Sequence, residues 1–123
     1  MSTQEIVNLT QKRITEIVVA RQEAGLLPSE LVPVERRHGD RWPFRGAVEL
    51  WPEGMDGRSL THGTCLNIGD SGMGLCCDEY HAPGETMEVA IHLPEMTLCG
   101  QAVVRYCSQV RNQFMVGMEF IYD

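Results

Sequence analysis

Four arginines lie close together in one short part of the chain. They are Arg36, Arg37, Arg41 and Arg45, and they share the segment from residue 35 to residue 45 with only two acids, Glu35 and Asp40. The chain as a whole is acidic, with 10 Lys and Arg against 17 Asp and Glu and a formal net charge of -7. A guanidinium group can donate two parallel hydrogen bonds to a phosphate or to the O6/N7 edge of guanine, and it can stack on a base. The segment therefore suits a guanine nucleotide with exposed phosphates, whereas a solvated linker paired with nearby acids is the alternative.

A second segment, residues 66–75, combines Asn67 with three glycines, Gly69, Gly72 and Gly74. Glycine allows positive φ and a close approach of a ligand to the backbone. The Asn67 amide can both donate and accept hydrogen bonds, either to a base edge or to the neighbouring backbone. We expect this segment to lie where one strand ends and the next begins. Taken alone, it is more typical of a tight hairpin without a ligand.

Together the two segments resemble the paired motifs of the PilZ family. Residues 36–41 match the pattern R-R-x-x-x-R, and residues 67–75 are similar to D/N-x-S-x-x-G-h-x-l, in which h and l are apolar. Residues 117–120 are similar to the family's closing G-x-x-F strand, so the resemblance extends from about residue 35 to residue 121. One position departs from the pattern, because Gly69 stands where the family has Ser.

The resemblance implies a six-stranded antiparallel β-barrel that binds the bacterial second messenger cyclic di-GMP. In this reading Arg37 and Arg41 would hold phosphate and guanine, and Asn67 would contact a guanine edge. The ligand-binding turn would be completed by Gly69 and Gly72. Arg36 lies directly before the pair Arg37 and Arg41. In this family an arginine at that place tends to accompany the binding of an intercalated dimer of the ligand.

The function implied is that of a receptor and not of an enzyme. Binding would switch a contact with an unidentified effector protein, in a pathway such as motility or exopolysaccharide regulation, with no cofactor, metal or catalytic residue. A ligand-independent PilZ-like interaction module is the alternative, and Gly69 favours it. Because Gly69 lacks the serine hydroxyl, the ligand would lose one hydrogen bond, which contributes about 1 kcal/mol to the free energy of binding.

Composition limits the other functions. The negative net charge argues against binding of a nucleic acid polymer, since affinity for the phosphate backbone rests on accumulated positive charge. The sequence has no basic start followed by an apolar run, and no stretch approaching the roughly 20 apolar residues of a membrane span, so we expect a cytoplasmic protein without membrane insertion. The four His lack metal-ligand spacing, and the five Cys are expected to be small buried or half-buried residues.

The N-terminal residues 2–24 have the pattern of an amphipathic α-helix. Ser2 and Glu5 form an S-x-x-E capping box, Met1 and Ile6 occupy the positions of a hydrophobic staple, and apolar residues recur at helical spacing up to Gly25. The apolar side would pack either on the rest of this chain or on a second copy, which would make a homodimer. We divide the chain into residues 1–27, the helix and the start of a Pro- and Gly-containing linker at 25–33, and residues 28–123, the barrel domain.

From residue 44 onward the helical periodicity gives way to short runs bounded by turn residues. The runs predict strands at residues 44–51, 59–68, 73–77, 86–93, 97–107 and 113–121. Residues 88–93 alternate between polar and apolar side chains, as expected of a strand with one buried face. Six short strands at this spacing predict a mainly β protein, a closed antiparallel barrel with an N-terminal helix.

Overall fold

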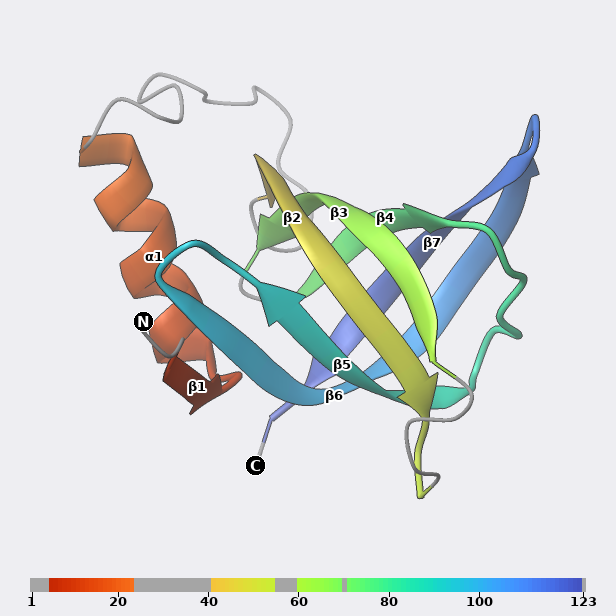
Figure 1. Cartoon of the computed structure of the whole chain (residues 1–123), viewed down its shortest axis with the longest axis horizontal. Helices are drawn as coiled ribbons and strands as arrows, with labels where there is room; N and C mark the ends of the chain where they lie inside the picture. Colours follow the sequence, from red (N-terminus) through yellow and green to blue (C-terminus); the bar gives the residue numbers. More distant parts are fainter. Residues whose placement is uncertain (1–4, 24–40, 55–59, 70, 123) are drawn as a thin grey trace.

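Six antiparallel strands close into a barrel in the computed structural model, which describes residues 5–23, 41–54, 60–69 and 71–122. The strands are β2 (Arg41–Pro52), β3 (Thr61–Gly69), β4 (Gly72–Cys77), β5 (Thr86–His92), β6 (Met96–Val110) and β7 (Gln113–Ile121). They pair in the order β5-β2-β3-β4-β7-β6, and the pairing of β6 with β5 completes the ring (Figure 1). The predicted mainly β class and six-stranded antiparallel barrel are confirmed.

Alternating side chains fill the inside of the barrel. In β5, Met87, Val89 and Ile91 are each at most 1% exposed, whereas Glu88 between the first two is half-buried. The predicted strands agree with the observed ones to within a few residues. The largest differences are that β2 begins at Arg41 instead of residue 44, and that β6 continues to Val110 instead of residue 107.

Bulges bend three of the strands. The β2–β3 register shifts between Pro43 and Gly46, and the β3–β4 register shifts between Cys65 and Asn67. A third shift, in the β6–β7 pairing, lies between Val104 and Tyr106. Because a bulge inserts an extra residue and increases the local twist, these positions supply the curvature that a closed barrel of short strands needs.

The predicted helix over residues 2–24 is wrong at its beginning. The chain first forms a short strand, β1 (Glu5–Asn8), and the helix α1 spans Gln11–Glu23. The helix is capped by Thr10, whose Oγ1 accepts a hydrogen bond from the Arg13 backbone N–H at 3.1 Å. Glu5 is therefore a strand residue and not part of a capping box, and Ser2 lies outside the described residues.

The edge of β6 explains why these residues become a strand. β7 pairs with β6 only as far as Gln101, opposite Ile121, and β1 pairs in parallel with the next part of the same strand, from Met96 to Cys99. The β-branched pair Ile6 and Val7 suits an extended strand. β1 thus satisfies backbone groups of β6 that β7 does not reach.

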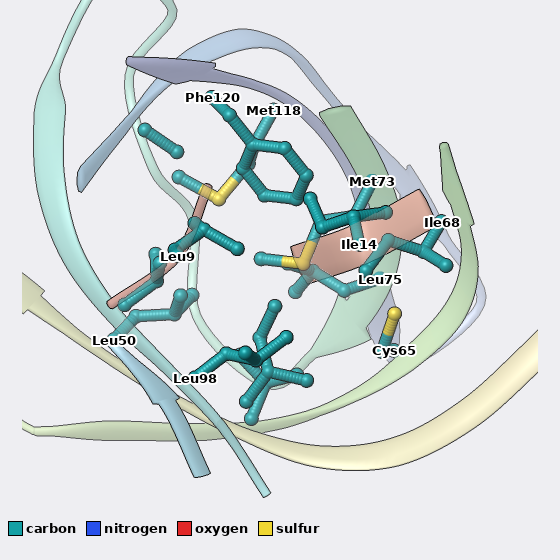
Figure 2. Close-up of a cluster of buried hydrophobic side chains, with 14 of the residues drawn as sticks. Leu9, Ile14, Leu50, Cys65, Ile68, Met73, Leu75, Leu98, Met118 and Phe120 are labelled. Carbon is teal, nitrogen blue, oxygen red and sulfur yellow. The ribbon is translucent and has the colours of Figure 1, made fainter. Parts of the chain in front are cut away.

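The helix packs on the barrel of its own chain. Ile14, Ile17 and Val18 are buried in the same apolar cluster as the barrel side chains, together with Leu9, which precedes the helix. Leu9 lies against Gly100 of β6, where an added Cβ would come within 2.7 Å of the Leu9 Cβ. Figure 2 shows Leu9 and Ile14 among side chains of the barrel strands. The apolar side of the helix is therefore used within the chain, and a homodimer through the helix stays a prediction.

Adjacent valines in α1 provide a direct test of this packing. Val18 is 2% exposed and Val19 is 43% exposed. We expect Val18→Ala to lower the free energy of unfolding by about 2 kcal/mol, because two buried methyl groups are lost and a cavity is left. Val19→Ala should stay within about 0.5 kcal/mol of the unchanged protein. Urea unfolding followed by circular dichroism measures both, and equal effects would contradict the packing of α1 on the barrel.

Candidate functional site

The register of β2 and β3 brings parts of the two predicted motifs together. Arg41, the last arginine of the first motif, lies opposite Gly69, and Pro43 lies opposite Asn67. In the second motif, β3 ends at Gly69 and β4 begins at Gly72, as the sequence predicted for this turn. Arg36 and Arg37 fall outside the described residues, as does the linker predicted at 25–33.

Asn67 is held in place by the bulge beside it. Its Oδ1 accepts a hydrogen bond from the Gly74 backbone N–H at 3.1 Å. The β3–β4 register shifts just before Asn67, which interrupts the regular backbone hydrogen bonds between the two strands. The side-chain oxygen acts as the acceptor at this interruption. This bond fixes the plane of the amide on the half-buried outer side of β3. A pre-oriented amide loses little conformational freedom when it meets a ligand.

The glycines of the turn serve close packing and not an unusual backbone conformation. The described glycines with positive φ are Gly54 and Gly84, so the positive φ expected of the motif glycines is not found at Gly72 or Gly74. A Cβ on Gly72 would overlap the carbonyl oxygen of Met118 in β7. A Cβ on Gly74 would come within 3.0 Å of the Asn67 Nδ2. Gly72 therefore permits the β4–β7 approach, and Gly74 provides the space in which the Asn67 amide lies.

These two glycines should differ in how well they tolerate alanine. Gly72→Ala meets backbone that cannot move without parting β4 from β7, and we expect a loss of about 1–3 kcal/mol in the free energy of unfolding. Gly74→Ala meets the amide end of Asn67, whose displacement costs one hydrogen bond of about 1 kcal/mol and leaves the strands paired, so its loss should be smaller. Chemical denaturation of the two variants checks the order, and a more damaging Gly74→Ala would contradict it.

The outer surface of the barrel has two sides of different charge. On the side formed by β3, β4, β7 and the end of β6, the outward residues are mostly uncharged, and we call this side the glycine face. It consists of Thr64, Asn67, Gly74, Cys76, Met115, Gly117, Tyr106 and Ser108. Its border carries Arg105 and Glu119, which form an ion pair with Arg105 Nε 2.6 Å from the Glu119 Oε1. An anionic ligand meets no uncompensated carboxylate among these residues.

The opposite side, formed by β2, β5 and the beginning of β6, carries three carboxylates; we call it the acidic face, with Glu49, Glu53 and Glu88. Gln101 Nε2 donates to both Glu53 and Glu88, at 3.1 Å each. Glu49 Oε1 lies 2.8 Å from His92 Nε2, and the other ring nitrogen of His92 lies 3.0 Å from Thr97 Oγ1. These charges make the acidic face unfavourable for a phosphate diester.

The cysteines and the described histidines are dispersed over the barrel and form no metal site among the described residues. All five Cys are free, and each is buried or half-buried, as the sequence predicted. Burial raises the pKa of the Cys77 and Cys99 thiols, and the neighbouring Glu49 and Glu88 raise that of Cys99 further. Both thiols are therefore protonated at neutral pH. Within the described ranges, no three His, Cys, Asp or Glu side chains are placed to hold a metal ion.

The described part of the chain contains no helix that is long and apolar enough to cross a membrane. Comparison with family models gives no match, and comparison with curated proteins gives no relative. Among solved structures, the chain resembles the Bacillus subtilis inhibitor of motility, MotI/DgrA, with a TM-score of 0.60 and 21% sequence identity. The likeness covers 77% of this chain and 47% of that one, so this chain corresponds to about half of that protein.

MotI/DgrA is a PilZ-domain protein. The barrel described here has a PilZ-like fold. At 21% identity the likeness shows a shared fold and does not identify a ligand or a partner of this chain. Sequence reasoning singled out Asn67, the glycine turn and, through the G-x-x-F resemblance, Gly117. It did not single out Tyr106, which lies on the same outer face, because the proximity of Tyr106 to Gly117 comes from the β6–β7 register.

Proposed function

We propose that this chain is a PilZ-like receptor for cyclic di-GMP, and that ligand binding alters a contact with an effector protein. The observation that carries the proposal is the β2–β3 register, which sets Arg41 opposite Gly69 and brings the end of the arginine motif to the Asn67 turn. Two segments that are separated by more than 20 residues in the sequence thus meet at one end of two paired strands. This arrangement is the one that a two-part ligand motif requires.

The chemistry of the two segments fits a cyclic dinucleotide. Arginine supplies bidentate bonds to phosphate or to the O6/N7 edge of guanine, and the oriented amide of Asn67 supplies a further contact to a base edge. The described charged residues at the border of the glycine face, Arg105 and Glu119, form an ion pair, so their charges compensate each other. The three glutamates of the acidic face lie on the other side of the barrel. A ligand with two phosphates is accordingly expected on the glycine face.

Titration with cyclic di-GMP tests the proposal directly. We expect Arg37→Ala and Arg41→Ala each to weaken binding by at least tenfold, because a charge-assisted hydrogen bond contributes about 1.5–3 kcal/mol. Arg13→Ala is the matched control, since Arg13 is a partly exposed arginine of α1 whose guanidinium lies 3.7 Å from Glu16. Isothermal titration calorimetry gives both affinity and stoichiometry. Absence of binding to the unchanged protein, or equal binding in all three variants, would reject the proposal.

Stoichiometry tests the role of Arg36 in the same experiment. If this arginine supports an intercalated dimer, calorimetry should give two ligands per chain, and Arg36→Ala should reduce the ratio to one. One ligand per chain in the unchanged protein would reject the dimer while leaving the receptor proposal intact.

The glycine in place of the motif serine leads to a further prediction. Gly69→Ser restores a hydroxyl beside Arg41 and should tighten cyclic di-GMP binding by about fivefold, the equivalent of one neutral hydrogen bond of about 1 kcal/mol. Gly69→Ala adds the same Cβ without the hydroxyl and serves as the control. If both variants bind alike, the hydroxyl has no role at this position.

A ligand-independent interaction module is the second candidate, and Gly69 is the observation that favours it. MotI/DgrA is named as an inhibitor of motility, which makes a protein of the motility apparatus a candidate partner for a barrel of similar fold. In this case the chain should bind the same partner with equal affinity in the presence and absence of cyclic di-GMP. A receptor should instead show a partner affinity that depends on the nucleotide.

A further inference from the structure

A row of paired residues crosses four strands of the glycine face. Asn67 in β3 pairs with Gly74 in β4, and Gly74 pairs with Gly117 in β7. Gly117 in turn pairs with Tyr106 in β6. Directly paired positions lie about 4.5–5.5 Å apart, so the row places two glycines between one amide and one phenol ring.

Each glycine of this row is covered by the side chain next to it. The Asn67 amide lies over Gly74, where an added Cβ would come within 3.1 Å of its Oδ1. The Tyr106 ring lies across Gly117, since a Cβ there would overlap the ring atoms Cε2, Cζ and Cδ2. The amide and the ring therefore cover two directly paired positions on neighbouring strands of the barrel.

The Tyr106 ring is both supported and accessible. Part of it packs on the backbone of Gly117, yet Tyr106 remains 52% exposed. A ring that rests on a strand backbone in this way loses little freedom when a second aromatic group stacks on it. Cross-strand packing of an aromatic residue over glycine also stabilises a sheet without any ligand, and the two roles predict different effects of replacing the ring.

We propose that Tyr106 is the stacking platform for a guanine base of the bound dinucleotide. This inference rests on the proposed function, because it assigns a further residue to the same site. A base stacked on the ring would present its edge toward Asn67, one glycine pair away, and its phosphates would continue toward the end of β3 that lies opposite Arg41. The Arg105–Glu119 pair borders the patch without leaving an uncompensated charge under the base.

Stacking on an aromatic side chain has a known magnitude and a clear chemical signature. Loss of one base–aromatic stack weakens binding by about 5- to 150-fold. Tyr106→Phe keeps the ring and should bind cyclic di-GMP nearly as well as the unchanged protein. Tyr106→Leu covers Gly117 with an apolar side chain but removes the π face, and Tyr106→Ala removes both. We therefore expect affinity to fall in Leu and Ala variants and to persist in Phe.

Tyr80 provides the matched control. It is also an exposed tyrosine, at 58%, and it makes an edge-on contact with Phe114 at a centroid distance of 6.0 Å. Phe114 pairs with Cys77 at the end of β4 that is remote from Gly72, so Tyr80 lies away from the candidate site. Tyr80→Ala should leave cyclic di-GMP affinity unchanged.

The experiment combines calorimetry with proton NMR of the guanine H8 signal. Stacking on Tyr106 should shift H8 upfield in the unchanged protein and in Tyr106→Phe, and the shift should be lost in Tyr106→Leu. Thermal unfolding of each variant shows whether the fold is kept. If the unchanged protein binds and Tyr106→Leu binds equally well with the same H8 shift, this inference is overturned while the receptor proposal stands. If the unchanged protein does not bind, the proposed function itself fails.

Discussion

The hydrogen-bonded register between β2 and β3 is the constraint on which the candidate site depends. A shift of one residue would turn Asn67 from the outer side of the barrel to the inner side and would exchange it with a buried neighbour such as Ile68. The bulges on both sides of β3 fix that register, and the Asn67–Gly74 hydrogen bond compensates for one of them. The site is thus built from irregularities in the barrel that also give the barrel its curvature.

Much of the barrel followed from local sequence patterns. Strands such as β5 show the polar and apolar alternation of a half-buried strand, and turn residues mark their ends, so six strands were predicted to within a few residues. The motif turn was placed correctly between β3 and β4 because glycine and asparagine there interrupt two apolar runs. These signals are short-range, and a single sequence contains them in full.

Features that depend on distant parts of the chain were not predictable in the same way. The S-x-x-E pattern at Ser2 suggested a helix start, but residues 5–8 form a strand because an open edge of β6, about 90 residues later, is available to pair with them. The contact of Tyr106 with Gly117 likewise depends on a register that shifts at a bulge. Sequence patterns indicate which local structure a segment favours. These contacts depend instead on which distant strand the fold brings next to that segment.

The glycines of the outer face bear on how this barrel can be compared with its relatives. Gly72 must stay small for β4 to approach β7 whether or not any ligand is bound, so its retention in a related sequence would say that the packing is kept and nothing about binding. Tyr106 is 52% exposed, whereas Asn67 is half-buried and bonded to the Gly74 backbone. Under the proposed function, variation at Tyr106 among barrels of this fold would therefore report on ligand binding more directly than retention of Gly72 does.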